Sequence, residues 1–145
     1  MKRLRRFGTS VVLCGLFICS LIASSCGPSL KISLPSAVER IPNPNFSIAD
    51  PDHPQQPQYD TVEVWDITEG NDTSKAKLVW KMVADPFGNQ KGVVRLSYGV
   101  KLEGFKFVTE PVQLEKGHQY RIRVAGSGEG NFRFRINPDG NVEGI

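Results

Sequence analysis

The sequence predicts an all-β domain built as a two-sheet antiparallel sandwich. From Thr61 onward, short runs rich in β-branched and aromatic residues alternate with clusters of turn-forming residues. No stretch of this region has the i, i+3, i+4 apolar spacing of an amphipathic helix. Six or seven short strands joined by turns are typical of a sandwich, and about 120 residues are enough for one such core.

The amino-terminal residues have the pattern of an export signal. A basic head at residues 1–6 precedes an uncharged apolar run at 11–23 that ends in small residues. A transmembrane helix is the alternative, but it needs roughly 20 apolar residues, and Gly27 and Pro28 follow soon after the run. We therefore interpret residues 1–25 as a cleaved signal peptide.

Residues 22–26, Ile-Ala-Ser-Ser-Cys, resemble the bacterial lipobox. The resemblance implies that Cys26 is diacylated on sulfur and then acylated on its new amino group. Ala23 stands where most lipoboxes have leucine, which keeps open ordinary cleavage with Cys26 as a free thiol. Gly27 replaces the aspartate that retains lipoproteins in the inner membrane, so the resemblance points to the outer membrane of a Gram-negative cell, with the domain facing the periplasm.

A proline-rich spacer is expected after the lipidated cysteine. Seven of the ten prolines lie between Pro28 and Pro57. Residues 30–34, Leu-Lys-Ile-Ser-Leu, alternate apolar and polar as a half-buried strand does, and with that strand formed, residues 35–57 would cross the domain surface. We assign residues 26–59 to the lipidated amino terminus, a first strand and the spacer, and residues 60–145 to the sandwich.

Six strands are predicted in the second part of the chain. They are residues 61–67, 77–84, 92–98, 105–108, 118–125 and 131–137. Alternation predicts the core from Leu78, Trp80, Met82, Val94, Leu96, Tyr98, Phe105, Phe107, Tyr120, Ile122, Val124, Phe132, Phe134 and Ile136. In the first strand Val62 and Val64 share one face while Trp65 and Ile67 share the other, which predicts a β-bulge or burial on both faces.

Two local patterns resemble known proteins. Leu114, Gly117 and Tyr120 have the spacing of the tyrosine corner of immunoglobulin-like and fibronectin type III domains, which implies that the tyrosine hydroxyl bonds the backbone of the preceding turn. Residues 98–105, Tyr-Gly-Val-Lys-Leu-Glu-Gly-Phe, resemble a Y-G-x-x-P-x-G-F run of small uncharacterised proteobacterial lipoproteins, with Leu102 in place of the proline. The first resemblance implies an immunoglobulin-like sandwich, and no activity follows from the second.

A search for catalytic groups gives no candidate, so we expect no enzyme and no cofactor. The three cysteines are Cys14, Cys19 and Cys26, so the sandwich has neither a disulfide nor a cysteine nucleophile. His118 is interpreted as an exposed turn residue. His53, near Asp50 and Asp52, could at most form a weak cation site, but hard cations prefer six or more oxygen ligands, so we interpret it as a loop residue and expect no metal.

Charge gives the one candidate binding surface. Four of the 18 basic side chains lie in the signal, which leaves 14 against 15 acidic ones and argues against nucleic acid as a partner. Arg121, Arg123, Arg133 and Arg135 all fall on the outward faces of the last two predicted strands. A hairpin centred near Gly128 would place Arg123 opposite Arg133 and Arg121 opposite Arg135.

Like charges placed opposite each other destabilise a sheet, so these arginines need acidic neighbours or an anionic partner. The first alternative is a solvated face with acids such as Glu115 or Glu143 nearby. The second is a patch for an anionic glycan, lipopolysaccharide or an acidic protein. We interpret the protein as a non-catalytic binding or interaction module held on the outer membrane by Cys26. The runner-up is an accessory lipoprotein of a secretion or envelope assembly, such as the type VI secretion system.

Overall fold

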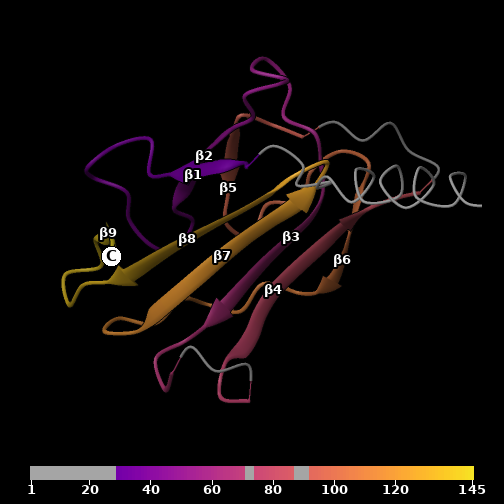
Figure 1. Ribbon diagram of the computed structural model, residues 1–145. Coiled ribbons are helices and arrows are strands. Elements are labelled where there is room, and N and C mark those ends of the chain that lie inside the picture. The colour runs from indigo at the N-terminus through magenta and orange to yellow at the C-terminus, as the bar shows by residue number, and fades with distance from the viewer. Residues whose placement is uncertain (1–28, 71–73, 87–91) are drawn as a thin grey trace, which may run out of the picture.

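The computed structural model describes residues 29–70, 74–86 and 92–145, and every regular element within them is a β-strand. The strands form two antiparallel sheets, one of three strands and one of six (Figure 1). In chain order they are β1 (Lys31–Ser33), β2 (Asn45–Ala49), β3 (Tyr59–Asp66), β4 (Lys77–Ala84), β5 (Arg95–Ser97), β6 (Phe105–Thr109), β7 (Gln119–Gly126), β8 (Glu129–Ile136) and β9 (Val142–Gly144). The predicted fold class is confirmed, with nine strands in place of six or seven.

The strand order is that of an immunoglobulin-like sandwich. The small sheet runs β1-β2-β5 and the large sheet runs β6-β4-β3-β7-β8-β9. Strands β1, β2 and β5 stand where immunoglobulin domains have A, B and E, and β3, β7 and β8 stand where they have C, F and G. The hairpin of β7 and β8 therefore lies beside β3, and its outward side chains share a face with those of β3.

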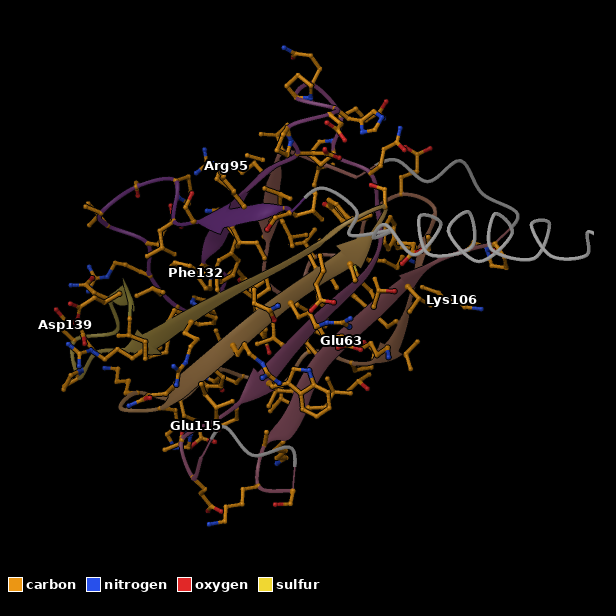
Figure 2. The ribbon with its side chains drawn as sticks, in the orientation of Figure 1. Glu63, Arg95, Lys106, Glu115, Phe132 and Asp139 are labelled. Atoms are coloured by element: carbon orange, nitrogen blue, oxygen red, sulfur yellow. The ribbon has the colours of Figure 1, made fainter. Side chains whose placement is uncertain are left out.

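One hydrophobic core fills the space between the sheets. Phe46 of β2 packs against Phe134 of β8, and Trp80 of β4 packs against Tyr98, each pair with ring centroids 5.1 Å apart. Phe132 of β8 packs against the edge of the core, on the side of the small sheet (Figure 2). The predicted core residues that are buried are Trp80, Met82, Leu96, Tyr98, Phe105, Tyr120, Ile122, Val124, Phe134 and Ile136, and Phe107 is partly buried.

Two residues predicted in the core have other positions. Val94 is 42% exposed because β5 begins only at Arg95. Leu78 pairs with Trp65, and both side chains point outward. The reason is a β-bulge in β4, in which Val79 is the extra residue and is buried in the core in place of Leu78. The bulge lies in β4 and not in β3, which alternates regularly from Val62 to Trp65 and ends at Asp66, before Ile67.

The sandwich includes residues that the sequence assigned to a spacer. Strand β1 forms at the predicted place, but β2 lies inside the expected spacer and buries Phe46 and Ile48 completely. The apolar-polar alternation of β2 lasts only five residues, and prolines lie close to both of its ends. For this reason no strand was predicted there from the sequence. The boundary at residue 60 is therefore wrong, and the sandwich includes residues from Leu30 onward.

Leu30 is fixed beside the loop between β7 and β8. Its side chain is 3% exposed, and its N–H donates to the carbonyl of Glu129 at 3.1 Å. Gly130 makes this contact possible, because a Cβ there would lie 2.5 Å from the carbonyl oxygen of Leu30. The first core residue of the described chain is thus held at one end of the large sheet.

Each of the three tyrosines is buried and holds a connecting segment through its hydroxyl. Tyr120 accepts the N–H of Glu115 at 2.9 Å, which is the contact that the tyrosine-corner resemblance implies. Tyr98 donates to the carbonyl of Val112 at 2.6 Å, and Tyr59 bonds the connection before β5. Burial raises the pKa of Tyr59 and Tyr120 to about 12, so both hydroxyls stay protonated at neutral pH.

Candidate functional site on the outer face of the large sheet

The four arginines singled out from the sequence lie on one face of the large sheet. Their neighbours along β7 and β8 are buried, so alternation turns all four away from the core; the buried neighbours are Tyr120, Ile122, Val124, Phe134 and Ile136. We call this face the outer face. Glu63 of β3 lies near its middle (Figure 2).

The pairing of the arginines differs from the predicted one by two residues. Arg121 pairs with Arg133, and Arg123 pairs with Asn131. The predicted pairs, Arg123 with Arg133 and Arg121 with Arg135, are wrong because the hairpin loop is centred on Ser127 and not on Gly128. One pair of opposed arginines therefore remains in place of two.

Arg123 is neutralised by acids of the same face. Its Nε and Nη2 donate to the two carboxylate oxygens of Glu129 at 2.9 and 2.8 Å, and its Nη1 lies 3.4 Å from Glu63 Oε2. Lys81 Nζ lies 2.7 Å from the other oxygen of Glu63. We call Lys81, Glu63, Arg123 and Glu129 the paired row, in which two cations meet two anions.

The lowered pKa values of Glu63 and Glu129 keep both carboxylates of the paired row charged at neutral pH. Hydrogen bonds from Arg123 and Asn131 lower the pKa of Glu129 to about 2. Burial raises the pKa of Glu63, but the hydrogen bonds and charges of Lys81, Trp65 and Arg123 together outweigh it and leave the pKa below its ordinary value. The paired row is therefore neutral as a whole.

Arg135 is also neutralised within the fold. It lies opposite Glu143 of β9, and its Nε and Nη2 donate to one carboxylate oxygen at 3.0 and 2.8 Å. The sequence named Glu143 as one acid that could satisfy an arginine, whereas Glu115 lies beside His118 instead. Half of the four-arginine patch is thus balanced by acids on the same face.

Arg121 and Arg133 have no such partner. Among the described residues, neither guanidinium has a carboxylate within 4.0 Å, although the two arginines are directly opposed across β7 and β8. Nε of Arg121 is buried and makes no hydrogen bond within the described chain. On the other side of Arg121, β3 places the half-buried Trp65 directly opposite it. We call Trp65, Arg121 and Arg133 the unpaired row.

Sequence reasoning missed Trp65, Glu63 and Glu129 as members of this face. Trp65 was visible only as the residue at which the alternation of β3 breaks. Glu129 lies between the predicted strands 118–125 and 131–137, yet it is the first residue of β8 and lies diagonally across from Arg123. On β7 and β8, the positive charge without an ion pair therefore lies on Arg121 and Arg133, between the paired row and the Arg135–Glu143 pair.

His118 has a more specific environment than an exposed turn. Its Nδ1 lies 2.7 Å from Asp66 Oδ2, its Nε2 lies 3.6 Å from Glu115 Oε2, and its ring stacks on Tyr120. The hydrogen bond to Asp66 raises the pKa of His118, although its partial burial opposes the rise. Asp66, Glu115 and His118 line a hollow of about 380 Å³ together with Thr68, Glu69, Lys75 and Lys77. Cations and anions are mixed in it, and no single ligand class follows from its charge.

The loop of His53 is a structural loop. Asp50 is 1% exposed and accepts the backbone N–H groups of Asp52, His53 and Gln58 at 3.0 to 3.2 Å. Its second oxygen also contacts His53 Nδ1 at 3.2 Å. These bonds occupy the oxygens that a cation would need, and the described residues contain no cluster of three or more metal-ligating side chains.

The predicted lipidation site cannot be placed on this structure, because Cys26 and the signal peptide lie outside the described residues. In the described ranges no helix is long and apolar enough to cross a membrane. Comparisons with protein-family models, curated proteins and solved structures found no match to this chain. Any function must therefore be argued from the residues themselves.

Proposed function

We propose that this protein is a non-catalytic binding module that binds an anionic partner through the outer face of its large sheet. Lipid on Cys26 would hold it on the outer membrane, with the sandwich facing the periplasm. The observation that carries the binding proposal is the opposed pair Arg121 and Arg133, neither of which has a carboxylate within 4.0 Å among the described residues. The charge of Glu129 acts on Arg121 only from a longer distance. Like charges opposed on a sheet cost stability, and an anion between them would remove that cost.

The proposed anchor would hold one end of the sandwich close to the membrane. Only three residues separate Cys26 from Leu30, and four extended steps of chain span at most about 14 Å. Two or more acyl chains are sufficient for stable anchoring. Because Leu30 bonds Glu129, the loop between β7 and β8 would lie nearest the lipid, and the end that carries His118 would point away.

The anchor is tested by Cys26→Ala in cells labelled with a palmitate analogue. We expect the variant to lose the label and to leave the membrane fraction, because the acylated cysteine is the proposed attachment. Cys19→Ala is the matched control, since it removes a cysteine from the apolar run of the signal and should keep both the label and the membrane association. Full labelling of the Cys26 variant would exclude the lipoprotein assignment.

The binding proposal is tested with the full-length protein in detergent on immobilised lipopolysaccharide. Two double variants are compared, and each removes one positive charge from β7 and one from β8. They are Arg121→Gln/Arg133→Gln and Arg123→Gln/Arg135→Gln. Because the net charge changes equally, a difference in their retention reports the position of the arginines. We expect the first variant to be retained more weakly than the second. The difference should vanish near 1 M salt, where charges are screened over about 3 Å. Equal retention of both variants would contradict the proposal.

A further inference from the structure

We infer that the unpaired row is a subsite for an acidic saccharide, whose sugar ring stacks on Trp65 while its carboxylate or phosphate bridges Arg121 and Arg133. This inference rests on the proposed function and names the class of its anionic partner. The three side chains stand in line across β3, β7 and β8, since Trp65 is opposite Arg121 and Arg121 is opposite Arg133.

The spacing of the row suits such a ligand. Neighbouring strands lie about 4.8 Å apart, so the row spans roughly 10 Å, within the length of a two-sugar unit. Trp65 is half-buried, and its Nε1 lies 3.4 Å from Glu63 Oε2, a contact that orients the indole edge toward the paired row. Trp65 keeps part of its surface exposed, and the apolar C–H side of a sugar ring would stack against that part.

The charges around the row select an anion at this position. The paired row beside it contains two cations and two anions, and Arg135 on its other side is bound to Glu143. The free positive charge of this part of the face is therefore concentrated on two adjacent guanidiniums. A carboxylate or phosphate can accept hydrogen bonds from two neighbouring guanidinium groups at once.

An extended acidic peptide fits the row less well than a saccharide does. Peptides commonly bind sheets by adding a strand to a free edge. Strands β3, β7 and β8 are each paired on both sides, so their backbone groups are engaged in the sheet. The row offers only an aromatic face and two planar cations, and these match a ring that carries an acid.

Trp65 provides a direct spectroscopic readout of binding. The chain has two tryptophans, and Trp80 is completely buried in the core, so a quencher in solution reaches mainly Trp65. The full-length protein in detergent would be titrated with trigalacturonic acid, its neutral methyl ester and inorganic tripolyphosphate. We expect trigalacturonic acid to protect Trp65 from acrylamide quenching and to bind at least tenfold more tightly than the methyl ester.

Matched variants separate the parts of the subsite. Arg121→Gln and Arg133→Gln should each weaken the binding of trigalacturonic acid by about tenfold or more, whereas Arg135→Gln should change it by less than about twofold. Trp65→Ala should weaken it by about twofold to tenfold, and Trp65→Phe should restore most of the affinity. The phenylalanine variant also guards against misfolding of the alanine variant.

The outcomes distinguish this inference from the function on which it rests. If tripolyphosphate binds as tightly as trigalacturonic acid, and Trp65→Ala changes neither affinity, the row is an anion site without a sugar subsite. That result overturns the inference and leaves the binding function standing. If no probe binds and lipopolysaccharide retention does not depend on Arg121 and Arg133, both fail.

Discussion

Arg121 and Arg123 lie two residues apart on β7, on the same face and with similar partial burial, yet they have opposite surroundings. Arg123 meets Glu129 and Glu63, whereas Arg121 meets Trp65 on one side and Arg133 on the other. The difference comes from strand register alone. A basic residue on an outward face is therefore a candidate for binding only when the pairing of its strand leaves it without an acid.

The comparison also shows that the number of arginines on a face does not give the net charge at each position of that face. Two Arg-x-Arg repeats on adjacent strands look like one basic stripe, but the acids of β3, β8 and β9 divide them into a neutral part and a cationic part.

The largest effect is expected from Tyr120→Phe, which acts where β7 begins. The hydroxyl of Tyr120 accepts the N–H of Glu115, and its loss leaves a backbone donor without this partner in the part-buried corner before β7. We expect the free energy of unfolding to fall by about 1–2 kcal/mol, measured by urea denaturation. A value indistinguishable from the parent would mean that the corner does not fix the start of β7.

The alternation of apolar and polar residues predicts which side chains face outward, but it does not predict the register that pairs the strands. Alternation identified the outward arginines and most of the core, and the spacing of Leu114, Gly117 and Tyr120 led to the corner. The register was missed because residues 126–130 are nearly all turn formers, so the loop could be centred on Ser127 or on Gly128 with equal plausibility. A shift of one loop residue changes every cross-strand pair by two.

The sequence also does not predict which residues far apart in the chain contact each other. Asp66 and His118 are 52 residues apart, and nothing local to either residue indicates the other. Strand β2 was hidden because its two core residues are set among prolines, which are typical of spacers. Both features depend on tertiary packing, which a local pattern does not encode.

A smaller change in the free energy of unfolding is expected from the titration of the Asp66–His118 pair, which joins the end of β3 to the start of β7. The hydrogen bond to Asp66 raises the pKa of His118, so its stabilising contribution is complete below about pH 6.5 and is lost as the pH rises through the raised pKa. Burial raises the pKa of Asp66, but hydrogen bonds from Thr68 and His118 outweigh it, so the contribution of Asp66 is lost only as the pH falls through its lowered pKa.

This dependence is measured by urea denaturation of the parent and of His118→Gln at pH 6 and pH 9. We expect the substitution to cost more stability at pH 6 than at pH 9, because the imidazolium pairs with Asp66 only at the lower pH. Glu115→Gln is the matched control, since Glu115 lies 3.6 Å from the ring and should change the stability less. An equal cost of His118→Gln at both pH values would contradict the assigned ion pair.

The most direct test of the difference between the paired and unpaired rows is the stability of Arg121→Gln against that of Arg123→Gln, measured by urea denaturation at low and high salt. Arg123→Gln should lose about 0.5–1 kcal/mol at low salt because it removes the cation bound to Glu129 and one of the two cations beside Glu63, and salt should reduce the loss. Arg121→Gln should keep the parent stability or gain a few tenths of a kcal/mol, because it relieves repulsion from Arg133. Equal losses in the two variants, unchanged by salt, would contradict the division of the outer face into a neutral and a cationic row.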